Sequence, residues 1–264
     1  MNKKYFFILL LISFIILILF FLLNIDYNSF KYKLKYHLIG AILPIIALFI
    51  IFLINKKNLR FLVFTTILIL LFFINSRAAF YSFFVIYLIY ILKEIGYKKF
   101  LYLLLSILLL SILLYFFNIV NLDERMFGIT TINQDGSFNE RLEQFKYGFE
   151  AIKSNWFFGQ YGGQVIFHDG SIYKNGLGSY MHNIFSFWRQ FGLLFFIIFV
   201  IFYFSRLLKI YNLWKINNIK YNFIFYLGLY MSINILFFHS YDYPQIWFVF
   251  ILMHLYIMDE YKNV

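Results

Sequence analysis

Residues 184–205, IFSFWRQFGLLFFIIFVIFYFS, carry one charged side chain, Arg189, in an otherwise almost continuous apolar run. A helix of about 20 apolar residues is long enough to cross the hydrocarbon core of a membrane. The other segments of similar composition are roughly 5–24, 37–54, 59–75, 78–93, 99–118, 221–238 and 244–258. The sequence therefore predicts an all-α, polytopic integral membrane protein with about eight transmembrane helices.

The composition of the whole chain excludes several other classes of protein. Apolar residues make up 63% of the 264 residues, charged residues make up 13%, and the mean hydropathy is +0.78. A soluble domain is about half apolar and a quarter charged, so we exclude a soluble globule, a disordered chain and a secreted disulfide scaffold. The chain has no cysteine, which rules out a thiol nucleophile and a thiolate metal site within it.

The net charge of +11 is better explained by membrane topology than by nucleic-acid binding. Lys and Arg accumulate in cytoplasmic loops, and most of them lie in alternate segments between the predicted spans. These segments hold Lys3 and Lys4; Lys56, Lys57 and Arg60; Lys93, Lys98 and Lys99; Arg206, Lys209, Lys215 and Lys220; and Lys262. We therefore expect both termini in the cytoplasm and the segment 119–183 on the outer side.

The expected organisation is five transmembrane helices in residues 1–118, a long extracytoplasmic loop in 119–183 between spans 5 and 6, and three transmembrane helices in 184–264. Lys3 and Lys4 followed by an apolar run resemble a signal peptide, but the run is long and no small-residue cleavage site follows it. We expect a retained helix there. A loop as long as 119–183 in a compact membrane protein is usually functional.

An amphipathic helix is predicted over residues 138–153 of this loop. Ser137 and Glu140 have the spacing of a capping box, which marks a helix start. An apolar stripe at helical spacing follows, formed by Leu142, Phe145, Phe149 and Ile152. The chain then returns to the membrane through a glycine-rich segment with Gly159, Gly162, Gly163, Gly170, Gly176 and Gly178. These glycines indicate either a flexible linker or tight turns that present amide groups to an anion.

Three arginines stand out by position. Arg77 lies in a tight turn, where an arginine is also a common membrane-interface anchor. Arg141 falls in the first turn of the loop helix, where the helix dipole disfavours a cation. Arg189 follows His182 by seven residues, so a helix starting at His182 would place both on one face, about 10 Å apart along the axis. Arg189 then either faces a polar cavity or extends to the lipid headgroups.

The order of these motifs resembles the O-antigen polymerase and O-antigen ligase family. They are Asn75-Ser76-Arg77-Ala78 at a turn, Arg141 opening a loop helix that runs on to Phe158-Gly159-Gln160-Tyr161-Gly162, and His182-Asn183 ahead of Phe191-Gly192-Leu193-Leu194. The resemblance covers roughly residues 59–205. Three features depart from the family pattern. Ala78 replaces the usual glycine, and eight residues instead of nine separate His182-Asn183 from Gly192. The chain is also shorter than usual, as in a minimal or N-terminally truncated member.

The resemblance implies a membrane glycosyltransferase without a cofactor, in the inner (cytoplasmic) membrane of a bacterium, with its active face in the periplasm. We expect it to be metal-independent, because the sequence lacks a metal-binding Asp-x-Asp motif. Its donor would be a glycan on undecaprenyl pyrophosphate, and its acceptor either lipid A–core (ligase) or a lipid-linked repeat unit (polymerase). His182, Arg141 and Arg77 are the expected catalytic residues. Arg189, Asn183, His168 and Asp242 are expected to bind the pyrophosphate or the acceptor. Membrane lipids are the other expected partners, and nucleic acid is not.

Two other functions remain open at this stage. A transporter or flippase of lipid-linked saccharides would show repeated halves and charges in the middle of the membrane, and neither pattern is seen in the sequence. A non-catalytic assembly protein is the third possibility, and the short chain permits it. The sequence contains no Asp-x-Asp pair, which many metal-binding nucleotide-sugar transferases carry.

Overall fold

The computed structural model describes residues 30–101 except 75, 95 and 99, residue 105, residues 136–162, and residues 181–262 except 217, 218 and 240. This part of the chain forms seven helices and no strand: α2 (Phe30–Leu53), α3 (Lys57–Phe73), α4 (Arg77–Glu94), α6 (Gly136–Ser154), α7 (Phe185–Lys215), α8 (Ile219–Phe237) and α9 (Pro244–Lys262). The predicted span 5–24, most of 99–118, and His168 lie outside the described residues.

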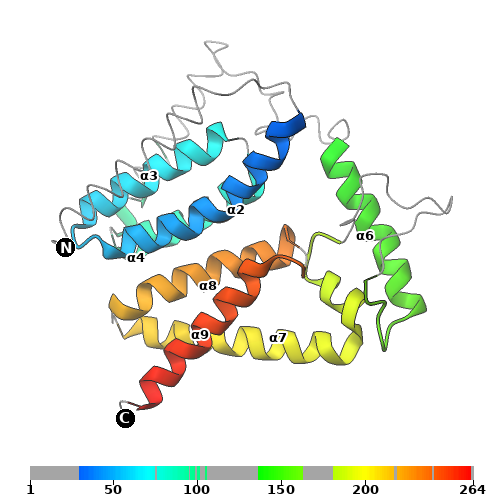
Figure 1. The fold of residues 1–264 in the computed structure, drawn as a ribbon. Helices are drawn as coiled ribbons and strands as arrows, with labels where there is room; N and C mark the ends of the chain where they lie inside the picture. The colour runs from blue at the N-terminus through cyan, green and yellow to red at the C-terminus, as the bar shows by residue number, and fades with distance from the viewer. Residues whose placement is uncertain are drawn as a thin grey trace.

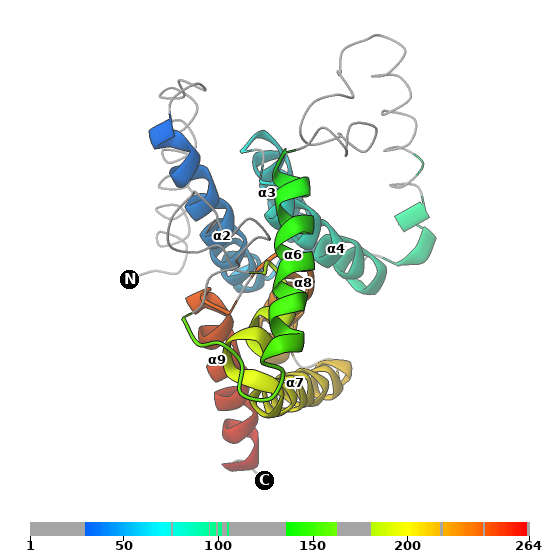
Figure 2. The ribbon, with the colours of Figure 1, turned by 90° about the vertical axis from the view of Figure 1, so that its right-hand side faces the viewer.

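The helices form two groups that pack on each other (Figure 1). One group is α2, α3 and α4, and the other is α7, α8 and α9. Helix α8 joins them, because it contacts α2 and α4 on one side and α7 and α9 on the other. Figures 1 and 2 show α6 crossing one end of this bundle, where it packs against the start of α7.

The core between the two groups is aromatic and aliphatic. The ring of Phe52 on α2 stacks on Tyr226 of α8 with centroids 5.1 Å apart, and Tyr90 of α4 meets Tyr226 edge-on at 6.4 Å. Such ring pairs stabilise a core beyond the area they bury. The abundant Phe and Tyr residues in these helices therefore act as packing residues.

Each described helix coincides with a segment that was predicted to be helical. Most of the helix ends differ from the predicted ends by several residues. The largest extension is α7, which continues ten residues beyond the predicted end at 205. Helix α6 begins at Gly136, so Ser137 lies within its first turn. Among the described residues, α7 alone is both long and apolar enough to cross a membrane, while Ile39–Leu53 and Tyr221–Phe237 are shorter apolar helices.

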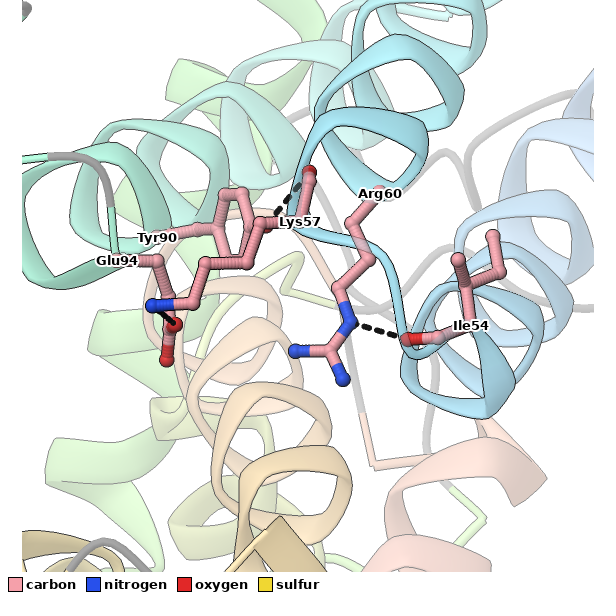
Figure 3. A network of polar contacts seen from close by, with 5 residues as sticks. All are labelled: Ile54, Lys57, Arg60, Tyr90 and Glu94. Atoms are coloured by element: carbon pink, nitrogen blue, oxygen red, sulfur yellow. Dashed lines mark hydrogen bonds and ion pairs between the residues drawn. The ribbon is translucent and has the colours of Figure 1, made fainter.

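One end of the bundle carries a network of basic and polar side chains, drawn in Figure 3. Lys57 pairs with Glu94 at 3.0 Å, and the hydroxyl of Tyr90 donates to the Lys57 carbonyl at 3.4 Å. Buried Arg60 donates from Nε to the Ile54 carbonyl at 2.5 Å. These bonds tie the α2–α3 turn to the end of α4. We call this end, which also holds the α7–α8 turn, the Lys57 end.

The opposite end of the bundle is called the Arg189 end. It holds the α3–α4 turn, the α8–α9 turn, the start of α7, and α6. Two observations bring its elements together: Gly40 of α2 lies against the side chain of Ser76, and the backbone N–H of Tyr241 donates to Ser186 Oγ at 2.9 Å. All the described candidate site residues lie at this end.

Candidate functional site

Helix α7 is broken at Gly192, its eighth residue. The glycine adopts φ 82° and ψ 173°, a backbone conformation that is essentially restricted to glycine. A Cβ atom here would lie 2.0 Å from the carbonyl oxygen of Phe157, so no larger residue fits. The break turns the first part of α7 away from the long apolar part, as Figure 1 shows.

A turn that follows α6 fills this break. The backbone N–H of Leu193 donates to the carbonyls of Trp156 and Phe157, both at 3.1 Å, and the N–H of Gln160 donates to the Arg189 carbonyl at 2.7 Å. A helix break leaves backbone groups without their intrahelical partners, and these bonds satisfy them. Gly159 allows the close approach, since a Cβ there would lie 2.4 Å from the Gly192 nitrogen.

The two glycine-containing motifs of the sequence therefore form one interlocked unit. The first, Phe158-Gly159, belongs to the loop, and the second, Phe191-Gly192, belongs to α7. The indole Nε1 of Trp188 adds a bond of 2.7 Å to the Trp156 carbonyl. The two backbones approach this closely only because Gly159 and Gly192 have no side chain. This contact explains why the first part of the predicted glycine-rich segment contains a glycine.

Arg189 and Gln190 lie in the last turn before the break, and both are buried. Arg189 is 2% exposed and is the largest of the fully buried side chains. The Oε1 of Gln190, which is 1% exposed, accepts a hydrogen bond of 2.9 Å from the N–H of Gly162. The Arg189 side chain is thus enclosed by protein and does not extend to a lipid surface. A cation is costly to bury, which makes this position a candidate for function.

His182 and Asn183 precede α7 and are half-buried. Asn183 Oδ1 accepts a hydrogen bond of 3.0 Å from the N–H of Phe185, so this side chain caps the start of the helix. Because α7 begins at Phe185, His182 is not part of it. The shared helical face of His182 and Arg189 was expected only for a helix that starts at His182, and this condition is not met. The two residues still lie at the same end of the bundle.

Helix α6 covers the start of α7 with a face that overlaps the predicted stripe only in part. Its buried positions are Gln144, Gly148 and Ile152, and Gly148 lies against the side chain of Met181. Leu142 is 57% exposed, so it does not belong to the packed face. Two phenylalanines pack at the side of this face: Phe145 and Phe149 contact the ring of Phe185 at 6.1 Å and 6.3 Å between centroids.

Arg141 and Asp242 are far apart in the sequence, but both affect the pKa of the Tyr243 hydroxyl. Burial raises the pKa of the Tyr243 hydroxyl, the adjacent Asp242 carboxylate raises it further, and the Arg141 guanidinium opposes them. The ring of His239 stacks on Tyr243 with centroids 3.8 Å apart. The α8–α9 turn thus carries Asp242, Tyr243 and His239 to the Arg141 side of α6.

Arg77 is the first residue of α4 and is half-buried. The preceding Ser76 is buried against Gly40 of α2, which fixes the α3–α4 turn at the Arg189 end. Arg77 therefore faces this end from the α2–α4 group. Arg141, His182, Asn183, Arg189 and Asp242 gather instead around the start of α7.

Two residues of this region were not among the predicted site residues. Gln190 is a polar side chain next to Arg189 in an apolar segment, and this contrast was a usable signal in the sequence. Tyr243 gave no such signal, because the chain contains 23 tyrosines. Only the approach of Arg141 and the stacking of His239 distinguish it.

The types of side chain gathered at this end, arginine, histidine and aspartate, can bind an anion and accept a proton. Arginine guanidinium groups bind phosphate oxygens in pairs and keep their charge at all physiological pH values. Imidazole and carboxylate groups are the usual general bases of enzymes. In the part of the chain that the structure describes, no group of three or more His, Asp or Glu side chains is arranged to hold a metal ion.

A family model described as O-antigen ligase matches residues 61–200, which is more than half of the chain. The match extends from α3 to the apolar part of α7 and includes Arg77, Arg141, His182 and Arg189. Comparison with curated proteins gives no match, and neither does comparison with solved structures.

Proposed function

The chain belongs to the O-antigen ligase family, and from that premise we propose that it transfers a glycan from undecaprenyl pyrophosphate to an acceptor hydroxyl. Proteins of this family are membrane proteins of O-antigen and surface polysaccharide assembly. The acceptor is lipid A–core for a ligase or a lipid-linked repeat unit for a polymerase. The reaction takes place at the periplasmic face of the inner membrane, with both termini in the cytoplasm.

In the proposed reaction, the acceptor oxygen attacks the anomeric carbon of the donor sugar. The bond from that carbon to the pyrophosphate oxygen breaks, and undecaprenyl pyrophosphate leaves with the electron pair. His182 accepts the proton of the acceptor hydroxyl as the general base. Asp242 is the alternative base if His182 binds phosphate instead.

The arginines stabilise the charge that develops on the leaving pyrophosphate. Fixed cations in a site from which water is largely excluded stabilise such charge more than water does. Arg141 and Arg77 are proposed to contact the phosphates, with Arg189 as the third cation. Asn183 caps α7 and thereby orients His182, and His168 remains a proposed sugar contact.

The observation that carries this proposal is the burial of Arg189 near the start of α7. At the same end of the bundle, Arg141 and Asp242 lie near Tyr243. Elements distant in the sequence bring cations and proton acceptors to a single end of the bundle. The proposed glycan transfer needs cations to stabilise the leaving pyrophosphate and a base to accept the proton of the acceptor hydroxyl. Both must lie on the same side of the membrane. This arrangement supports surface chemistry over a role in translocation or in assembly alone.

The proposal is tested by the surface glycan ladder of a deletion strain, complemented with the wild type, Arg141→Ala or His182→Ala. Lys146→Ala is the matched control, because it removes an exposed cation from the same helix. We expect both site variants to lose the ladder at normal protein levels and the control to restore it. Membrane fractions are blotted to verify expression.

The product left in the variants distinguishes the two reaction types. A single repeat unit on lipid A–core would identify a polymerase, whereas accumulated lipid-linked polymer with no attached glycan would identify a ligase. If Arg141→Ala and His182→Ala both restore a full ladder, the catalytic assignment is wrong. A scaffold or a flippase would then be the remaining functions.

A further inference from the structure

The turn after α6 exposes a cluster of aromatic side chains, which we call the aromatic turn (Trp156–Tyr161). Phe158 is 84% exposed and Tyr161 is 80% exposed, and about half of the Trp156 and Phe157 side chains is exposed as well. Isolated exposed apolar residues are common on proteins, but a contiguous cluster usually marks a surface that another molecule covers. Within the described residues, nothing covers Phe158 or Tyr161.

The position of the aromatic turn along α7 is fixed. The carbonyls of Trp156 and Phe157 accept the bonds from Leu193, and Gln160 bonds to the Arg189 carbonyl. The ring of Tyr161 also packs against Phe191, with centroids 5.7 Å apart. The turn therefore lies beside the break in α7, where the long apolar part of that helix begins (Figure 1).

The part of α7 after the break has the length of a membrane span. From Leu193 to Lys215 it extends about 34 Å by the rise of an α-helix, slightly more than the roughly 30 Å of the hydrocarbon core. Up to Leu208 its exposed residues are apolar and recur at helical spacing, and they are Leu194, Ile197, Ile198, Ile201, Phe202 and Leu208. Nearer its end Lys209, Asn212 and Lys215 are exposed, as expected where a helix leaves the hydrocarbon core. If this part spans the membrane, the break at Gly192 lies at the outer membrane–water interface, and so does the aromatic turn.

We propose that the aromatic turn is inserted into the outer interface of the lipid bilayer and anchors the loop there. Trp and Tyr favour this interface because their rings are apolar while their N–H and O–H groups need polar partners. The exposed apolar surface is continuous along α7, since Leu194, two residues after the break, is 62% exposed. A lipid surface is therefore the occupant that the surroundings of the turn indicate.

This anchoring would set the depth of the proposed active site. The backbone of the aromatic turn bonds to Arg189, and Gly162 bonds to Gln190, so the turn and these buried residues share one level. Phosphate groups of lipids lie at the same level of a bilayer. The inference rests on the proposed function only for the assumption that α7 spans the membrane.

The test measures the depth of single-cysteine labels in proteoliposomes made from the full chain, which has no natural cysteine. Phe158→Cys carries an environment-sensitive fluorophore, and lipids with nitroxides near the headgroup or deep in the acyl chain quench it. Leu194→Cys and Ile201→Cys are depth references on α7. Ile201 should lie about 10 Å deeper than Leu194 because seven residues separate them. Glu143→Cys, on the exposed polar side of α6, is the aqueous control.

We expect the Phe158 label to be quenched by the shallow nitroxide to the same extent as the Leu194 label, roughly 5–10 Å into the boundary between headgroups and acyl chains. A label at Tyr161→Cys should give the same depth. This second position shows whether the substitution at Phe158 has itself disturbed the turn. The Glu143 label should be quenched by neither lipid.

Two results would overturn the inference, and they differ in meaning. If the α7 references are quenched at their expected depths but the labels at 158 and 161 are not, α7 spans the membrane and something other than lipid covers the turn. If none of the labels is quenched, the membrane placement of α7 is wrong as well, and the proposed function loses its lipid-linked donor.

Discussion

At the scale of single residues, Gly192 links the backbone of α7 to the position of Arg189. The break it permits exposes backbone groups that the aromatic turn then satisfies. Arg189 and Gln190 occupy the turn before the break and are enclosed by the same contact. A glycine without any chemical function therefore supports the charged residue that the proposed reaction needs.

Replacement of Gly192 by alanine should destabilise the protein more than replacement of Gly162. Both have positive φ, for which a side chain costs about 1–3 kcal/mol. A Cβ at Gly192 would also collide with the Phe157 carbonyl, whereas nothing lies within 4 Å of one at Gly162. Melting temperatures in detergent measure the difference. Equal shifts for Gly192→Ala and Gly162→Ala would show that the close contact at the break does not form.

At the scale of elements, the turns at the two ends of the bundle are held by different interactions. At the Arg189 end, backbone groups bond directly to each other and to short side chains such as Ser186 and Asn183. At the Lys57 end, long basic side chains reach carbonyls, as Lys93 does with the Trp214 carbonyl at 3.2 Å. The second kind of contact stabilises the ends of the helices by giving hydrogen-bond donors to their free carbonyls.

Arg60→Ala should lower the stability of the α2–α3 turn more than Lys57→Ala does. Buried Arg60 satisfies the Ile54 carbonyl, and loss of a bond from a charged donor costs about 1.5–3 kcal/mol. The Lys57 side chain is 62% exposed, so its pair with Glu94 contributes at most about 1 kcal/mol. The check is the melting temperature together with the glycan ladder. Both variants should keep the ladder, and a ladder lost in Arg60→Ala at a normal protein level would mean that the Lys57 end takes part in the reaction.

At the scale of the whole molecule, the candidate residues lie at the Arg189 end of the bundle, and the network of basic and polar side chains lies at the opposite Lys57 end. Positively charged loops remain in the cytoplasm, so the Lys57 end is expected inside and the Arg189 end outside. Helix α6, which crosses the Arg189 end, would then lie along the outer membrane surface (Figure 2). This orientation presents the site to lipid-linked substrates in the outer leaflet.

Cysteine labelling of intact cells tests this orientation. Asp242→Cys should react with a membrane-impermeant maleimide, because the exposed α8–α9 turn faces outward in the proposed topology. Asn58→Cys, also exposed but at the Lys57 end, should react only after the membrane is permeabilised. Labelling of Asn58→Cys in intact cells with protection of Asp242→Cys would require the opposite orientation, and with it a cytoplasmic site.

Much of the fold was predictable from the sequence because helices in this chain are local features. The apolar runs around residues 37–54, 59–75 and 78–93 predict α2, α3 and α4 within a few residues, apart from the earlier start of α2 at Phe30. Their composition alone determines that they are helical and apolar. The family resemblance was also readable from short motifs in order, and the family match over residues 61–200 confirms it. The number of spans and the roles of the site residues stay predictions.

The arrangement of the site could not be read from the sequence, because it depends on contacts between distant segments. Periodicity suggested that Leu142 belongs to the packed face of α6, but packing against Met181 selects the face with Gly148 instead. A helical projection would place His182 and Arg189 on one face of a helix that starts at His182. The Asn183 side chain instead caps α7, which begins at Phe185 and so excludes His182. The sequence by itself determined an apolar helical protein and its family. Only the tertiary structure decided that Gly159 packs on Gly192 and that Arg141 of α6 comes near enough to Tyr243 to lower its pKa, since such neighbours exist only once helices pack.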